Sequence, residues 1–182
     1  PYLHFKKDQK TLLVSFARSG NSPESIAAVE LGKQFVDDFY NLPITCAKEG
    51  KLAVGLKDDE NSYVFLNPEK TNDKGFAMTN SFSSMLLATL LIFDTTVDNK
   101  KEIVDKVSAI AKETYDRAEE IEKMVNFDFD RVAYLGSGPL GKLTKEARLK
   151  ILELTAGEVT TIFDTSMGFR HGPKSYINDN AL

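Results

Sequence analysis

The feature that most constrains the fold is a strand-loop-helix pattern near the start of the chain. Three apolar residues, 12–14, follow polar ones and are typical of a buried strand, so we expect a strand over residues 11–16. The next segment, residues 18–22, reads Arg-Ser-Gly-Asn-Ser. Ser22 and Pro23 then form a typical helix start, because a serine N-cap precedes a proline whose missing N–H costs nothing at the first helical position. Such strand-to-helix turns are common in α/β folds.

Residues 18–22 are a candidate anion site. The first N–H groups of a helix lack intrahelical partners and the helix dipole is positive there, so a phosphate can be held at this point. The segment is not a Walker loop, because it lacks Gly-Lys-Ser/Thr, and its single glycine excludes a dinucleotide fingerprint. From these residues alone, a well-capped turn without a ligand explains the pattern equally well. Under the two interpretations Arg18 is a phosphate clamp or an ordinary surface arginine.

Composition places the chain among ordinary globular proteins and restricts its partners. The 182 residues are 42% hydrophobic and 27% charged, with a net charge of −4. This balance argues against a nucleic-acid partner, whereas a small phosphate can still be held by local dipoles. The single cysteine, Cys46, excludes an internal disulfide and fits the reducing cytoplasm. We expect it to be a buried strand residue rather than a nucleophile.

We expect no membrane segment, metal or other cofactor. The start of the chain lacks the apolar stretch of a signal peptide, and the longest apolar stretch, residues 85–93, is too short to span a bilayer. The two histidines and one cysteine show no metal-ligand spacing. Because the first residue is proline, we expect that the natural start of the protein is missing from this sequence.

In the first half of the chain the predicted elements alternate between strand and helix. After the first strand they are a helix over 23–38, a strand over 44–47, a short helix over 52–56 and a strand over 63–66. The Asn-Leu-Pro segment at 41–43 is expected to break the pattern. Residues 76–93 are apolar nearly all round, which predicts a buried helix.

A long amphipathic helix is predicted over residues 98–125. Its apolar stripe consists of Ile103, Val107, Ile110, Ala118, Ile121 and Val125. The strand-loop-helix pattern then returns as a strand over 131–135, a small-residue loop, a helix over 140–156 stopped by Gly157, and a strand over 159–163. A last loop, residues 168–174, opens a short helix at Pro173.

This repetition predicts a three-layer αβα fold with parallel sheets. We interpret the chain as a tandem duplicate whose second copy is incomplete. The predicted parts are a first domain at residues 1–98 without its N-terminal part, a connecting helix at 99–126 and the start of a second domain at 127–182.

Three motifs resemble those of the SIS (sugar isomerase) domain family. Residues 19–25 read Ser-Gly-Asn-Ser-Pro-Glu-Ser and are similar to its phosphate loop, Ser-Gly-x-Ser/Thr-x-Asp/Glu-Ser/Thr. Together with residues 71–79 and 168–175 they resemble the tagatose-6-phosphate ketose/aldose isomerase group, also described as galactosamine-6-phosphate deaminase/isomerase. The resemblance covers essentially the whole chain. It implies two flavodoxin-like SIS domains with five-stranded parallel sheets, of which this chain holds most of the first and about half of the second.

The resemblance also implies which residues bind substrate. Those expected to hold the phosphate are Ser15, Arg18, Ser19, Gly20, Asn21 and Ser22. Those expected to line the sugar are Asp73, Phe76, Ala77 and Thr79. Arg18 departs from the more distant relative, glucosamine-6-phosphate synthase, whose loop carries an uncharged residue there.

The isomerase half of that synthase implies the catalytic residues. Its catalytic helix, Ala-Leu-Lys-x-x-Glu, is similar to residues 147–153, and its Lys-His-Gly-Pro is similar to residues 170–173. By this match Glu153 moves the proton between C1 and C2, His171 assists ring opening, and Lys150 lies near the reacting carbons. Without the resemblance, Lys150 and Glu153 are typical of a solvated ion-pair face and His171 of a surface loop.

Two functions follow from the resemblance. The first is a sugar-6-phosphate aldose/ketose isomerase, acting on an amino-sugar phosphate such as galactosamine 6-phosphate and giving tagatose 6-phosphate through an enediol, with loss of ammonia. A carboxylate base and a group that exchanges protons near neutrality suit that chemistry. The alternative is a non-catalytic sugar-phosphate sensor, which does not need Glu153 and His171. We expect a homodimer or higher homo-oligomer, because the apolar stripe and the incomplete second domain leave apolar surface to cover.

Overall fold

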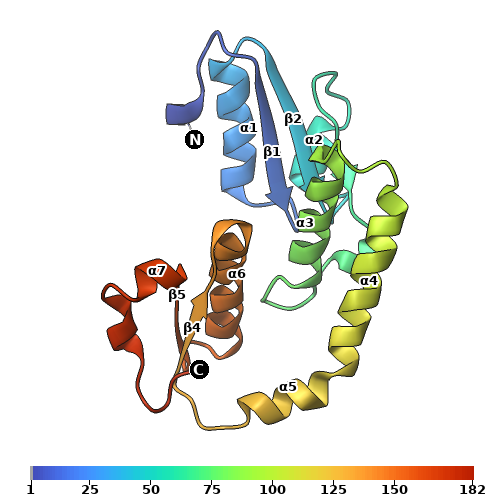
Figure 1. Ribbon diagram of the computed structural model, residues 1–182. Coiled ribbons are helices and arrows are strands. Elements are labelled where there is room, and N and C mark those ends of the chain that lie inside the picture. Colours follow the sequence, from blue (N-terminus) through green and yellow to red (C-terminus); the bar gives the residue numbers. More distant parts are fainter. Residues whose placement is uncertain (1) are drawn as a thin grey trace. The chain divides into compact units, whose positions relative to one another are not determined.

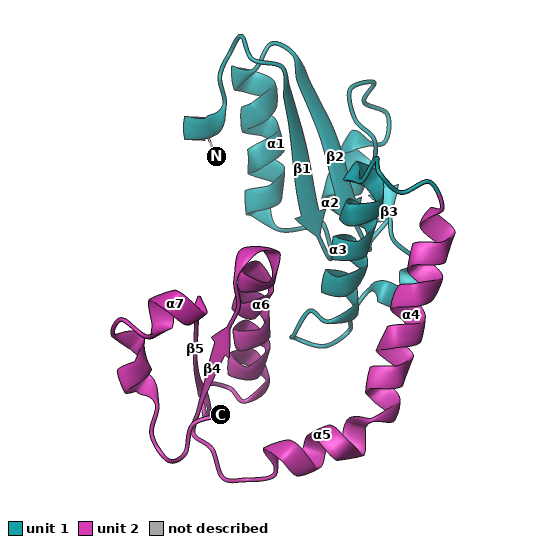
Figure 2. Ribbon diagram, viewed as in Figure 1, with its two compact units in different colours: residues 1–98 teal, residues 99–182 magenta. Residues whose placement is uncertain are grey.

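The computed structural model describes residues 2–182 and divides into two compact units, residues 1–98 and 99–182 (Figure 2). The elements of unit 1 are η1 (Tyr2–His4), β1 (Thr11–Ala17), α1 (Pro23–Phe35), β2 (Phe39–Thr45), α2 (Lys51–Leu56), β3 (Phe65–Leu66), η2 (Glu69–Thr71) and α3 (Asn80–Phe93). The elements of unit 2 are α4 (Lys100–Asp116), α5 (Ala118–Val125), β4 (Arg131–Leu135), α6 (Gly138–Leu154), β5 (Thr160–Asp164), α7 (Ser166–Phe169) and η3 (Pro173–Tyr176). No helix among the described residues is long and apolar enough to cross a membrane.

Unit 1 is a three-layer arrangement around a parallel sheet with strand order β1-β2-β3 (Figure 1; β3 is labelled in Figure 2). One face of the sheet packs on α1 and α2 through a cluster of Ala17, Val29, Leu52 and Leu56. The other face packs on α3 through a cluster of Leu42, Ile44, Met85 and Ala88. Because side chains alternate along a strand, Leu13 joins the first cluster and Val14 the second. This sheet carries the loops of the predicted phosphate site at the carboxyl ends of its strands.

The second strand is longer than the sequence predicts. It begins at Phe39, whereas the Asn-Leu-Pro segment was expected to delay it to residue 44. Pro43 lies in the strand, fully buried opposite Ser15 of β1. A proline cannot donate to the ladder, and on the β3 side the pairing is interrupted between the Asn41–Ser62 bridge and the Ile44–Phe65 pair. The same residue therefore shortens β3, which was predicted over 63–66 but covers Phe65–Leu66.

Two helices of unit 1 differ from their predicted form. The helix α1 ends at Phe35, before the predicted limit of residue 38. Its Gly32 lies against the ring of Phe39, where an added Cβ would come within 1.9 Å of the ring. The helix α3 begins at Asn80 and buries only one face, because Leu90 and Phe93 remain 58% and 49% exposed, so the expectation of an all-round buried helix is wrong for this chain.

Unit 2 contains a second parallel pair, β4 and β5, joined by α6. The last residues of the chain extend this pairing, since Leu182 N–H donates to Arg131 O and Ala133 N–H donates to Leu182 O. They occupy the edge of β4 that β5 leaves open. The helix α6 ends at Leu154, before the predicted limit of residue 156, and the predicted stop residue Gly157 follows with a φ of +85° and an N–H that donates to Leu152 O.

The long helix predicted over 98–125 is two helices. Arg117, with φ −97° and ψ 16°, interrupts it between α4 and α5. Nearby, the hydroxyl of Thr114 bonds back to Ile110 O at 2.9 Å, a pattern that bends helices. The predicted apolar stripe is largely uncovered, with Val107, Ile110 and Ile121 45%, 64% and 45% exposed.

The parallel α/β architecture predicted from the sequence is confirmed. The assignment of residues 1–98, 99–126 and 127–182 to a first SIS domain, a connector and the start of a second SIS domain stays a prediction.

Candidate active site

The loop after β1 is held in shape by the start of α2. Leu52 N–H donates to Gly20 O at 2.9 Å, and Lys51 N–H donates to the Asn21 side-chain oxygen at 3.0 Å. Asn21 N–H in turn donates to the Ser19 hydroxyl at 3.3 Å. Asn21 therefore organises the loop through its oxygen, and only its amide hydrogens remain to face a ligand.

Two glycines allow this close approach. Gly20 is buried and has a φ of +67°, a conformation that L side chains rarely adopt. Gly50 lies so close to the loop that an added Cβ would come within 2.1 Å of Ser19 O. The loop and the α2 start thus form one packed unit, and Gly50 is a contributor to it that the sequence pattern alone does not predict.

Ser22 occupies the N-cap position of α1, with proline following it, as the sequence predicts. Its side chain makes no capping hydrogen bond, so the expectation that its hydroxyl caps the helix is wrong. The backbone carbonyl of Ser22 accepts the hydrogen bond at the helix start instead, because Ser25 N–H donates to Ser22 O at 3.1 Å. The hydroxyl of Ser22 is therefore free to contact an anion at the helix N-terminus.

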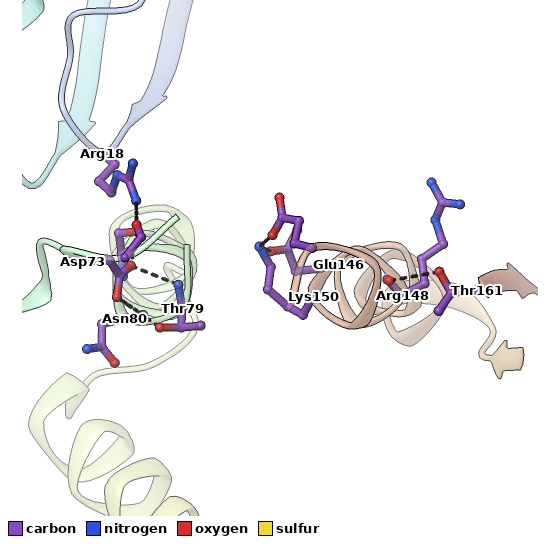
Figure 3. A network of polar contacts seen from close by, with 11 residues as sticks. Arg18, Asp73, Thr79, Asn80, Glu146, Arg148, Lys150 and Thr161 are labelled. Atoms are coloured by element: carbon purple, nitrogen blue, oxygen red, sulfur yellow. Dashed lines mark hydrogen bonds and ion pairs between the residues drawn. The ribbon is translucent and has the colours of Figure 1, made fainter. Parts of the chain in front are cut away.

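Arg18 joins the loop to the segment that precedes α3. Its guanidinium Nη1 donates to Gly75 O at 2.7 Å, so the two segments predicted to hold the phosphate and the sugar meet in unit 1 (Figure 3). Ser15, by contrast, lies within β1, paired with Pro43, and belongs to the strand rather than the loop.

Asp73 organises the start of α3 (Figure 3). Its carboxylate accepts hydrogen bonds from the N–H groups of Thr79, Asn80 and Ser81 at 2.9–3.0 Å and from the hydroxyls of Thr79 and Ser81 at 3.0 and 2.6 Å. Burial by itself raises the pKa of Asp73, but the hydrogen bonds from Ser81, Thr79 and Asn80 outweigh it and hold the pKa well below its ordinary value. Both carboxylate oxygens of Asp73 accept hydrogen bonds from the start of α3. The negative charge of Asp73 also interacts favourably with the positive end of the helix dipole.

The other residues predicted to line the sugar lie in the same segment. Phe76 is 81% exposed and Ala77 is half-buried. Thr79 is the residue before α3 and is bonded to Asp73. Ser81, fully buried and bonded to the same carboxylate, was missed; an acidic residue shortly before a Thr-Asn-Ser helix start is the signal that could have found it.

In unit 2, Lys150 lies between two carboxylates on α6. Its ammonium is 3.0 Å from Glu146, the pair labelled in Figure 3. It is also 2.7 Å from Glu153, and the three side chains are only 19–24% exposed. Partial burial by itself lowers the pKa of Lys150, but the hydrogen bonds to Glu153 and Glu146 outweigh it and raise the pKa above its ordinary value. The predicted ion pairs are thus present, but they are largely covered rather than a fully solvated face.

The α6 helix that carries these residues is fixed to β5. The hydroxyl of Thr161 donates to Arg148 O at 3.1 Å. The Lys145 ammonium and the Arg148 guanidinium both lie over the ring of Phe163, at 5.4 and 5.3 Å from its centre. Glu153 is therefore presented from a helix that is held to the sheet at several points.

His171 follows α7, a short helix that the sequence reading missed. Thr165 caps α7, since its hydroxyl accepts from Gly168 N–H at 2.9 Å, and a threonine three residues before a glycine is the signal for such a turn. His171 N–H donates to Gly168 O, and Gly172 follows with a φ of +149°. The imidazole is exposed, and no hydrogen bond within residues 2–182 joins it to Glu153. The same residues contain no group of three or more His, Cys, Asp or Glu side chains that could hold a metal ion.

Comparison with known proteins identifies close relatives. No family model matches the chain. D-galactosamine-6-phosphate deaminase AgaS of Shewanella sp. strain ANA-3 is 46% identical over 180 residues, covering 99% of this chain and 46% of the relative. D-galactosamine-6-phosphate deaminase AgaS of Escherichia coli is 43% identical over 174 residues, covering 94% of this chain and 45% of the relative. The chain thus spans about half the length of the curated relatives it matches.

Solved structures give the same result. The tagatose-6-phosphate ketose/aldose isomerase of Escherichia coli matches with a TM-score of 0.90 at 41% identity, over 100% of this chain and 50% of that one. A protein of Clostridium novyi matches with a TM-score of 0.91 at 50% identity, over 100% of this chain and 47% of that one. Over nearly its whole length the chain is therefore similar to AgaS proteins and to tagatose-6-phosphate ketose/aldose isomerases, the group that its three motifs resemble.

Proposed function

We propose that the protein to which this chain belongs is an aldose/ketose isomerase of sugar 6-phosphates that acts on galactosamine 6-phosphate as a deaminase. The observation that carries this proposal is the 46% identity to a D-galactosamine-6-phosphate deaminase over nearly the whole chain. The geometry agrees with it in two places. Unit 1 offers a serine-bearing loop at a helix N-terminus, and unit 2 offers a largely covered carboxylate beside a cation.

The phosphate is the group by which the protein binds the substrate at a distance from the reacting carbons. Ser19 and Ser22 supply hydroxyl donors, and the loop and the first turn of α1 supply backbone N–H groups. Asn21 shapes the loop through its bond to Lys51 N–H. Binding energy from this remote group holds the reacting carbons in place, which lowers the barrier of a step that involves other atoms.

Glu153 is the base in this mechanism. In the open-chain substrate it removes the proton from C2, giving an enol that carries the amine, and returns a proton to C1. His171 assists the opening of the sugar ring by proton transfer, a role that an imidazole suits. Lys150, which is cationic and bonded to Glu153, orients the carboxylate next to the reacting carbons.

The amine makes the reaction a deamination. Proton return to C1 leaves C1 reduced to an alcohol and C2 oxidised to an imine. Water adds to C2, the C2–N bond breaks, and ammonia leaves, so galactosamine 6-phosphate and water give tagatose 6-phosphate and ammonia. The hydrolytic step needs no oxidant or reductant.

The test uses the full-length protein with galactosamine 6-phosphate, following ammonia and ketose together. Both products should appear in equal amounts, and in D₂O the product should carry deuterium at C1 because the base exchanges its proton with solvent. Glucosamine 6-phosphate serves as the epimer control and should react more slowly. Tight binding of the sugar phosphate without either product would mean the sensor alternative instead.

A homodimer in the cytoplasm completes the proposal. The uncovered residues Val107, Ile110 and Ile121 provide apolar surface that a second copy could bury, and the single cysteine, Cys46, is buried and unpaired, as suits a reducing compartment. Light scattering on the full-length protein checks the first point. A mass of one protomer across the micromolar range would contradict it.

A further inference from the structure

The segment between Asp73 and α3 has few means of keeping its shape. Residues 73–78 form neither helix nor strand, and none of them donates or accepts a backbone hydrogen bond to another backbone group within the described part of the chain. Lys74, Gly75 and Phe76 are exposed. Three contacts of this segment are defined among the described residues: the Asp73 carboxylate at the α3 start, the side chain of Met78 against the core, and the Arg18 guanidinium on Gly75 O.

Of these three contacts, the one from Arg18 links the segment to the phosphate loop. Arg18 lies 57 positions from Gly75 in the sequence and directly precedes Ser19, and its 2.7 Å bond uses one of the five donors of a guanidinium. The remaining donors form a planar fork suited to a phosphate oxygen. No ion pair joins Arg18 to a carboxylate elsewhere in residues 2–182.

We infer that Arg18 is a positioning residue that couples phosphate binding to the shape of residues 73–78, with Asp73 as the fixed end of that segment. This inference rests on the proposed function, in which the phosphate binds at residues 18–22. A bound phosphate holds the guanidinium in place, and the guanidinium holds Gly75 O, so occupancy at one end of the substrate orders the segment expected to line the sugar. A simple phosphate clamp would have no such effect on the second segment.

The discriminating variant is Arg18→Lys. An ammonium keeps the charge that attracts a phosphate, but its donors sit on one atom and cannot span a phosphate and Gly75 O together. In the full-length protein we expect KM for galactosamine 6-phosphate to stay within about threefold of wild type, while kcat falls about ten- to a hundredfold because the sugar is misplaced. The matched control is Lys74→Gln, which removes an exposed cation from the same segment and should leave both constants unchanged.

A second measurement does not depend on turnover. Lys74 is exposed within the segment, so the rate of tryptic cleavage at the Lys74–Gly75 bond reports the order of residues 73–78. Without ligand, cleavage should be at least about threefold faster in Arg18→Lys and Arg18→Ala than in wild type, with cleavage at other lysines unchanged. Inorganic phosphate should slow this cleavage in wild type and fail to slow it in Arg18→Ala.

The outcomes separate this inference from the proposed function. If wild-type protein releases neither ammonia nor ketose, the proposed function fails, whereas the cleavage rates without ligand still decide whether Arg18 orders the segment. If Arg18→Lys raises KM alone and the Lys74–Gly75 bond is cut at the wild-type rate, Arg18 serves only the phosphate and the coupling is refuted. Absence of protection by phosphate in wild type refutes it as well.

Discussion

In unit 1, β1 passes into α1 through residues 18–22, and in unit 2, β4 passes into α6 through Gly136 and Ser137. Both helices have a serine at the N-cap and a proline in their first turn, and neither serine makes a side-chain capping bond. The first loop is held by another element, the start of α2. The second packs on its own helix, where an added Cβ on Gly136 would come within 2.9 Å of Thr144.

This difference decides where each unit can carry chemistry. A loop that is fixed from outside can present its hydroxyls and N–H groups to a ligand without losing its shape. A loop that packs on its own helix has less room for a ligand, and the side chains that we propose to react in unit 2, Lys150 and Glu153, lie farther along α6. The same strand-loop-helix unit thus carries the proposed phosphate loop in unit 1 and the proposed base, Glu153, on its helix in unit 2.

The largest effect is expected from Glu153→Gln, which keeps the size of the side chain and removes the base. We expect kcat with galactosamine 6-phosphate to fall by about a thousandfold, because a general base contributes on that order, while KM changes little. Glu158→Gln, at an exposed position after α6, is the control. Wild-type turnover in Glu153→Gln would mean that another residue is the base.

Alanine at two glycines tests how strongly the close approach of Gly50 fixes the first loop, with a glycine at the start of α6 as the comparison. Gly50→Ala places a Cβ against Ser19 O and should destabilise unit 1 by about 2–4 kcal/mol. Gly138→Ala meets nothing within 4 Å and carries only the strain of its φ of +57°, about 1 kcal/mol. Urea unfolding measures both. Equal losses would mean that the close approach of Gly50 to Ser19 O does not fix the first loop.

The serines test whether only the first loop binds phosphate. Ser19→Ala and Ser22→Ala should each raise KM by about tenfold, because each removes one hydrogen bond to a charged group, with kcat nearly constant. Ser137→Ala is the matched control, since Ser137 has the same N-cap position in unit 2. An unchanged KM in both unit 1 variants would mean that the phosphate does not bind at residues 18–22.

The smallest effect concerns Asp73 and pH. Its pKa is held below the ordinary value, so its contribution to stability is complete above the unfolded-state pKa near 3.9 and is lost as pH falls through the lower folded-state pKa. At neutral pH, Asp73→Asn should lower the free energy of unfolding by about 1–2 kcal/mol. The difference in the free energy of unfolding between wild type and Asp73→Asn should become smaller below about pH 4. A difference that stays constant between pH 7 and pH 3 would contradict the role assigned to the carboxylate.

Local patterns in the sequence were sufficient for the order of most elements, although not for α7 or for the division between α4 and α5. The apolar run at 12–14, the Ser22-Pro23 helix start and Gly157 each act on their immediate neighbours, so the positions of β1, α1 and the end of α6 follow from them. The ion pairs of Lys150 follow in the same way, from helical spacing. The roles of Glu153 and His171 rest on the family resemblance and stay predictions.

Only the tertiary structure decided the features that depend on distant partners. The sequence shows that Pro43 lacks a donor, but not that the missing bond falls on the β3 side of β2. It shows a cation at Arg18 and a carboxylate at Asp73, but their partners, Gly75 O and the start of α3, are set by how the chain folds back. Local periodicity predicts whether a segment is a helix or a strand. A contact between segments far apart in the chain depends instead on the packing of the whole sheet, which no local pattern predicts.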